Sequence, residues 1–136
     1  MRIVLDSNIL IASLGKRSRL RPIWQAFTEG VYQLIVSEDI LKEYEEIMQK
    51  HSAPGVAEIV MEIFIESPDI FTQKVFYNWN AISADPDDNK FFDIAVAADV
   101  DYLVTNDRHF DIVKTITFPK VSILSAEDFL NILLKS

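Results

Sequence analysis

Residues 2–8 read RIVLDSN, in which a short apolar run passes directly into three polar residues. The run has no helical period, which is typical of a strand buried on both faces of a sheet. A second run, LVTND at residues 103–107, ends in the same way. If these strands are parallel, Asp6 and Asp107 lie at one edge of the sheet, where such sheets bind their ligands.

Extended and helical segments alternate along the rest of the chain. Pro22 suits the first turn of a helix, and Gly30 ends it. Ser37 and Ser125 are the predicted N-caps of two further helices. The pattern predicts other strands at 32–36, 71–76, 102–104 and 121–124, and helices at 38–50, 56–65, 91–98 and 126–135. This alternation indicates an α/β fold with a parallel sheet covered on both faces, in one domain spanning residues 1–136.

The composition excludes several kinds of site. The chain of 136 residues has no Cys, which rules out a disulfide scaffold, a thiolate zinc site and a cysteine nucleophile. It has 2 His but 21 Asp and Glu. Any bound metal is therefore expected to be a hard cation on oxygen ligands, and Mg²⁺ and Mn²⁺ are the candidates.

The N-terminus and the net charge bear on location and partners. No apolar run has the length of a signal peptide or a membrane span, so we expect a cytoplasmic protein with no membrane partner. The net charge of −8 argues against a broad basic surface for nucleic acid. Eight of the acidic residues lie between positions 85 and 111, so the negative charge is concentrated there.

Four carboxylates are predicted to converge at the carboxyl edge of the sheet. Asp6 and Asp107 follow strands, Asp88 begins a helix, and Glu43 lies in the helix after the second strand. Two carboxylates about 4 Å apart repel by about 4 kcal/mol at an effective dielectric near 20, so such a site favours a bound cation. A divalent ion on carboxylates, which keeps its waters and takes phosphate oxygens, suits phosphodiester hydrolysis.

Each carboxylate also has a simpler interpretation. Asp6 and Asp107 could cap turns or helices, and Glu43 could belong to a solvated helix face. Asp85 and Asp87 compete with Asp88 for the third position, and one or two of the three could only shape the turn.

Four segments together resemble the PIN domain family, and within it the VapC-type toxins of prokaryotic toxin–antitoxin systems. They read DSN at 6–8, SEDILKE at 37–43, DPDDNKF at 85–91 and LVTND at 103–107. The resemblance covers essentially the whole chain. It implies a three-layer α/β/α sandwich with a parallel five-stranded sheet, Mg²⁺- or Mn²⁺-dependent endoribonuclease activity, and an antitoxin that occupies the active-site groove.

The resemblance also assigns residues. The family's acidic quartet falls on four positions, expected to be both metal ligands and catalytic residues: Asp6, Glu43, Asp88 and Asp107. Asn8 and Thr105 are expected to hold those carboxylates in place, and Asp87 is the alternative to Asp88. The expected partners are an RNA substrate and an antitoxin protein, and the oligomeric state stays open, with a homodimer among the alternatives.

Further residues are candidates for substrate contact. Four basic residues lie just after the first strand, which places them near the same edge: Lys16, Arg17, Arg19 and Arg21. They could bind RNA phosphates or belong to a solvated loop. Trp24 is expected in the core, whereas Trp79, in a polar loop, could be a base-stacking platform. His109 follows Asp107 closely enough to touch substrate.

Two other classes of protein would place an aspartate after a first parallel strand. An aspartate-based phosphatase needs a second acid where Asn8 stands, and a receiver domain needs paired acids before its phosphoacceptor and a late lysine, so neither pattern is met. The remaining alternative is a catalytically silent interaction module of the same fold. Divalent-metal binding distinguishes it, because such a module needs no carboxylate cluster.

Overall fold

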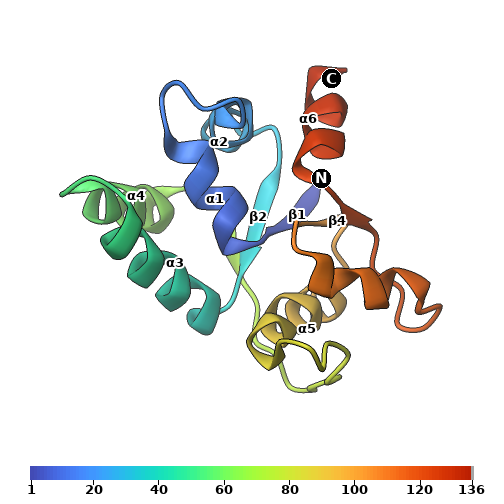
Figure 1. Ribbon diagram of the computed structural model, residues 1–136. Helices are drawn as coiled ribbons and strands as arrows, with labels where there is room; N and C mark the ends of the chain where they lie inside the picture. Colours follow the sequence, from blue (N-terminus) through green and yellow to red (C-terminus); the bar gives the residue numbers. More distant parts are fainter. Residues whose placement is uncertain (136) are drawn as a thin grey trace.

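The computed structural model describes residues 1–135, which form a five-stranded parallel sheet in the order β3-β2-β1-β4-β5 (Figure 1). The strands are β1 (Arg2–Leu5), β2 (Gln33–Val36), β3 (Ile70–Thr72), β4 (Tyr102–Val104) and β5 (Ile123–Leu124). The helices are α1 (Ser7–Leu14), α2 (Arg21–Thr28), α3 (Glu38–His51), α4 (Val56–Glu66), α5 (Asn89–Ala97) and α6 (Ala126–Leu134), with 3₁₀ segments η1 (Pro86–Asp88) and η2 (Arg108–Thr115). The predicted parallel α/β fold is confirmed.

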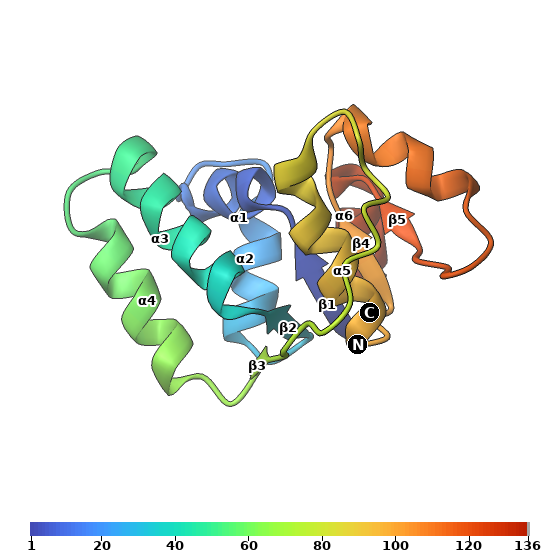
Figure 2. The ribbon, with the colours of Figure 1, turned by 90° about the horizontal axis from the view of Figure 1, so that it is seen from below.

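Helices cover both faces of the sheet. In one layer α1 contacts α2 and α3, α3 contacts α4, and α2 contacts α6. On the other face α5 packs against β1, β2 and β4, and Figure 2 shows it in front of β1 and β4. The crossover through α1 and α2 leads from β1 to β2, whereas β4 lies on the other side of β1. The strand order therefore reverses between β1 and β4, and ligands of open α/β sheets bind at such a point.

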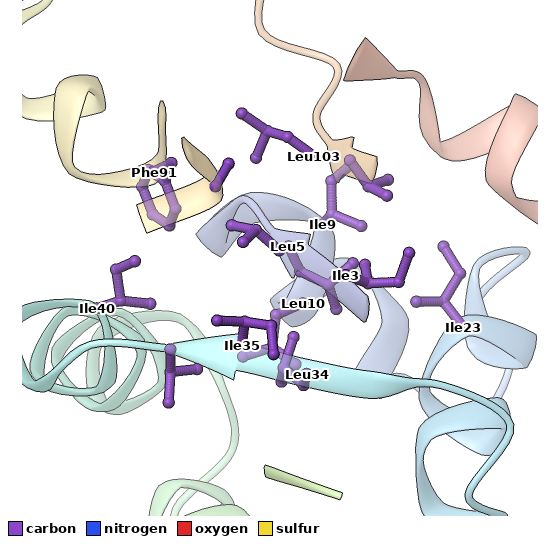
Figure 3. Packing of buried hydrophobic residues seen from close by; sticks show 14 of the residues in the cluster. Ile3, Leu5, Ile9, Leu10, Ile23, Leu34, Ile35, Ile40, Phe91 and Leu103 are labelled. Carbon is purple, nitrogen blue, oxygen red and sulfur yellow. The ribbon is translucent and has the colours of Figure 1, made fainter. Parts of the chain in front are cut away.

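The central strands are buried on both faces, as their apolar runs predicted. Ile3, Val4 and Leu5 are at most 1% exposed, and Leu103 is fully buried. Figure 3 shows Ile3, Leu5 and Leu103 packed among side chains of α1 and β2. Removing this much apolar surface from water is the main stabilising contribution to the sheet, at roughly 25 cal/mol for each Å² buried.

Local signals in the sequence set the helix ends. Ser37 Oγ accepts a hydrogen bond from the Ile40 N–H, and Ser125 Oγ accepts one from the Asp128 N–H, so both predicted N-caps are confirmed. Trp24 lies in the core as expected, with its ring 5.6 Å from Phe27. Within residues 1–135, no helix combines the length and the apolar character that a membrane crossing requires.

Three elements differ from the sequence prediction. Helix α1 was not predicted, because the ILIASL run at residues 9–14 is apolar on nearly every side and has no amphipathic period. The strand expected at 71–76 is β3, which ends at Thr72. Residues 73–84 instead leave the sheet and run along α5 as an extended segment, which we call the strap (Figure 2). The last strand is also shorter than predicted, because only Ile123–Leu124 pairs with β4.

Candidate active site

The candidate site lies where the ends of β1 and β4 meet. Asp6 follows β1 directly, and its N–H donates to the carbonyl oxygen of Val104, so the two strand ends are joined one residue beyond the sheet. Thr105 and Asp107 follow β4. The reversal of strand order thus brings two of the predicted carboxylates to one place, as the parallel arrangement required.

Asp6 is buried and held by Thr105. Thr105 Oγ1 donates to Asp6 Oδ2 at 2.7 Å and accepts from the Asp107 N–H at 3.0 Å, so one hydroxyl positions both aspartates. Burial raises the pKa of Asp6, and the charges of Asp107 and Glu43 raise it further, against the effect of the Thr105 hydrogen bond. Asp6 stands at the N-cap position of α1, yet its side chain does not cap that helix. Its carboxylate therefore faces the site.

A second group of side chains lies beside Asp6. One ligand atom from each of four residues lies within 4.8 Å of the others: Asp85, Asp88, Asp107 and His109. His109 Nδ1 is 3.3 Å from Asp107 Oδ1, 3.4 Å from Asp88 Oδ2 and 3.7 Å from Asp85 Oδ2. Two of the aspartates also act as helix caps. Asp85 Oδ1 accepts from the Asp87 N–H at the start of η1, and Asp107 Oδ1 accepts from the His109 N–H at the start of η2.

Asp88 is the member of this group with a buried oxygen that makes no hydrogen bond. Among buried side-chain nitrogen and oxygen atoms of residues 1–135, only Asp88 Oδ2 has no hydrogen-bond partner. Burial, together with the charges of Asp85, Asp107 and Asp6, raises the pKa of Asp88 to about 7, against the opposing effect of His109. A buried carboxylate oxygen that makes no hydrogen bond, lies 3.4 Å from the His109 ring nitrogen and faces other carboxylates matches a site built for a cation.

Glu43 is oriented from the other side of the site. It accepts a hydrogen bond from Ser7 Oγ, and its Oε1 is 2.5 Å from Lys90 Nζ, with both charged side chains about one-fifth exposed. Its charge acts on Asp6, which places it beside the aspartates. Lys90 also lies 3.3 Å from Asp87, whose side chain is 81% exposed. Asp88, and not Asp87, therefore points into the site.

The sequence pattern of the PIN domain family matches residues 2–109, which include all four predicted carboxylates. The chain belongs to the PIN domain family. The match leaves out only the end of η2, β5 and α6, and the parallel five-stranded sheet agrees with the fold that the resemblance implied.

A solved structure resembles this PIN domain protein over nearly its full length. It is a chain in the crystal structure of VapBC2 from Rickettsia felis bound to a DNA fragment from the promoter. The TM-score is 0.61, the sequence identity is 14%, and the match covers 92% of this chain and 98% of that chain. At 14% identity, this match shows that the two chains share a fold and no more. A comparison with curated protein sequences finds no match.

Other predicted residues are placed differently from expectation. The side chain of Asn8 is exposed and makes no hydrogen bond within the part of the chain described, although its backbone N–H lies near the Asp6 carboxylate. The basic segment does not follow the first strand directly, because α1 intervenes and ends far from the carboxyl edge of β1 (Figure 1). There Arg19 pairs with Glu127, and Arg21 donates to the Leu14 carbonyl oxygen.

The sequence did not predict the site roles of three residues, Ser7, Lys90 and His109. Ser7 and Lys90 lie inside the quoted motifs, one residue after Asp6 and two after Asp88, and this adjacency was the available signal. His109 was expected to touch substrate but not to lie among three aspartates. Its position depends on η2, which turns the chain back so that residues 107 and 109 face the same way.

Proposed function

We propose that this PIN domain protein is a metal-dependent endoribonuclease that hydrolyses phosphodiester bonds of single-stranded RNA. The observation that carries the proposal is the buried Oδ2 atom of Asp88, which makes no hydrogen bond within residues 1–135 and lies among the carboxylates of Asp85 and Asp107 and the ring of His109. Membership of the family gives a nuclease as the coarser expectation. The donor set, which is almost entirely carboxylate oxygen, supports Mg²⁺ or Mn²⁺ as the cofactor.

The residues present fit such an ion. Asp88 and Asp107 would hold it. Asp6 lies next to them, and Glu43 adds a further negative charge beside Asp6. When bound, the ion would polarise the phosphoryl oxygen, lower the pKa of a coordinated water and neutralise the leaving oxygen.

The remaining residues prepare the carboxylates for this role. Thr105 fixes Asp6 and the backbone of Asp107, while Ser7 and Lys90 fix the two oxygens of Glu43. Groups that orient ligands in this way usually change metal affinity or activity by 10- to 100-fold when they are removed. We therefore assign Thr105, Ser7 and Lys90 as positioning residues.

The partner that we propose is a cognate antitoxin protein. The support is the resemblance of the sequence motifs to VapC-type toxins, together with the similarity of fold to a chain of VapBC2. A small neighbouring gene that encodes a DNA-binding N-terminal segment would be the candidate. Co-expression followed by purification of a stable complex that no longer cleaves RNA tests this proposal, and cleavage undiminished by the partner contradicts it.

We retain Lys16, Arg17 and Arg19 as proposed contacts to RNA phosphates outside the metal site. Lys16 and Arg17 have no ion-pair partner among residues 1–135, which leaves their charge available, whereas Arg19 would have to leave Glu127. Each phosphate contact made by such residues releases counterions, so binding should weaken with salt.

A cleavage assay tests the proposed function. Purified protein is incubated with labelled single-stranded RNA, duplex RNA and single-stranded DNA, each with Mg²⁺, with Mn²⁺ and with excess chelator. We expect cleavage of single-stranded RNA with either ion and none with chelator. Cleavage that survives chelator refutes the metal requirement, and absence of cleavage of every substrate favours the silent interaction module.

A further inference from the structure

Three aromatic rings from two distant segments meet on the surface, and the proposed metal site does not use them. We call Tyr77, Trp79 and Phe118 the aromatic surface. The Tyr77 and Trp79 rings are 4.6 Å apart and the Trp79 and Phe118 rings 6.2 Å apart, both edge to face. Tyr77 is 64% and Phe118 82% exposed, while Trp79 is half-buried between them. Such a group of exposed rings usually marks an interaction site.

The strap anchors two of these rings, Tyr77 and Trp79, to the helix that begins at the acidic site. The Trp79 N–H donates to Asp93 Oδ1 at 3.1 Å, and the Asn89 side chain bonds both the N–H and the carbonyl of Ile82. Asp93 lies five residues after Asp88 along the helix that Asp88 precedes, a separation of about 7.5 Å along the axis. Figure 2 shows the strap continuing along α5 toward the start of that helix.

The two segments that supply the rings have a charge opposite to that of the whole chain. Residues 70–84 contain Lys74 and no acid, and residues 112–126 contain Lys114 and Lys120 and no acid, in a chain of net charge −8. Lys74 and Lys120 are exposed and have no ion-pair partner within the described residues 1–135. Lys74 and Lys120, three residues before Tyr77 and two after Phe118, thus put positive charge on the segments that carry the rings, which suits a polyanion that also presents flat apolar faces.

We propose that the aromatic surface binds bases of single-stranded RNA by stacking, next to the site of cleavage. This inference rests on the proposed nuclease function and adds the surface that would hold the substrate strand. Every base has a π-face, so aromatic side chains flanked by lysines bind single strands with little sequence preference. At about 3.4 Å of rise per stacked nucleotide, a few nucleotides cross the distance from Trp79 to Asp88.

The strap offers a matched control in Phe76. This side chain is 89% exposed and lies one residue before Tyr77, but its ring contacts none of the three aromatic rings. It lines instead a cavity of about 650 Å³ that the strap forms with the first turns of α3 and α5. Phe76→Ala thus removes a ring that is more exposed than that of Tyr77 from the same segment and leaves the aromatic surface intact.

The test measures the Kd of a labelled single-stranded oligoadenylate by fluorescence anisotropy, with chelator present so that the strand stays whole. Removing one stacking ring costs about 5- to 150-fold in Kd, so Tyr77→Ala and Phe118→Ala should weaken binding by that factor. Tyr77→Phe and Phe118→Tyr should bind as wild type does, because they keep a ring. Phe76→Ala should also match wild type, and a strand of abasic sugars should bind every variant equally.

Separate outcomes identify which proposal fails. If wild type cleaves RNA and Tyr77→Ala and Phe118→Ala keep its Kd, the stacking inference is overturned and the nuclease proposal stands. If Phe76→Ala weakens binding as much as they do, the effect is not specific to the three rings and the inference is equally overturned. If Phe118→Ala abolishes a concentration-dependent dimer but leaves the RNA Kd unchanged, the surface joins two copies of this chain instead.

Discussion

Replacing Asp88 by Asn should make the metal-free protein more stable while it destroys the proposed activity. Oδ2 of Asp88 is buried and makes no hydrogen bond, the side chain as a whole is 14% exposed, and the charges of Asp85, Asp107 and Asp6 lie close by. An amide of nearly the same shape removes that charge. Most substitutions destabilise, so a gain in stability at this position would indicate a site kept for function.

The magnitude follows from the pKa of about 7, against 3.8 for an unhindered aspartate. Each pKa unit corresponds to about 1.4 kcal/mol, so the whole shift would correspond to about 4 kcal/mol. Solvent reaches the group from one side and screens its charge, which reduces the expected gain to roughly 0.5–2 kcal/mol.

The stability gained by Asp88→Asn should increase with pH. Below about pH 4 the carboxyl is protonated in both folded and unfolded protein, so its pKa shift costs no stability there. Between about pH 4 and pH 7 the folded state holds a proton that the unfolded state has lost, so wild-type stability falls as the pH rises. Above about pH 7 the loss is complete, and there Asp88→Asn should differ most from wild type.

Urea denaturation with chelator at about pH 5 and about pH 8 measures this difference through the midpoint and the slope. Asp87→Asn is the matched control, because Asp87 is adjacent, 81% exposed and paired with Lys90. It should give no gain at either pH. If Asp88→Asn is less stable than wild type at the higher pH, or if its effect equals that of Asp87→Asn, the Asp88 charge does not destabilise the folded protein.

Other expected outcomes concern the surroundings of the site. Thr105→Val should cost about 1–3 kcal/mol of stability, since it removes the hydroxyl that bonds Asp6 and the Asp107 N–H, and it should lower cleavage; an unchanged melting temperature would contradict this. Mn²⁺ at about 100 times its Kd should stabilise wild type by about 2.7 kcal/mol and Asp88→Asn by much less, and equal shifts in thermal melts would count against the site. Arg17→Ala should reduce the slope of log K against log salt for single-stranded RNA by about 0.7, and an unchanged slope would assign this segment to a solvated loop.

Much of the fold was predictable because the signals are local. The apolar runs that end in Asp6 and Asp107 identify buried parallel strands, and such strands can meet only at one edge. Ser37 and Ser125 cap helices by accepting from backbone N–H groups three residues later. These features depend on short stretches of chain, so periodicity and capping rules are sufficient to find them.

The parts that were not predictable depend on the surrounding structure. Helix α1 has no amphipathic period, because Ile9 and Leu10 are buried while other faces also pack against neighbours. Its presence moves the basic segment away from the edge at which it was expected. The contacts of His109 with Asp85 and Asp88 join η2 to η1, and only the assembled fold brings those segments together.

The position of a bound Mn²⁺ ion would show whether Asp88 and Asp107 hold a metal, on which the proposed nuclease activity depends. Crystals soaked in Mn²⁺ would be examined by anomalous diffraction, which locates the ion independently of its ligands. The predicted result is a peak within bonding distance of carboxylate oxygens of Asp88 and Asp107, on the side facing Asp6. A peak only at other carboxylates, or no peak at an Mn²⁺ concentration that supports cleavage, would contradict the account.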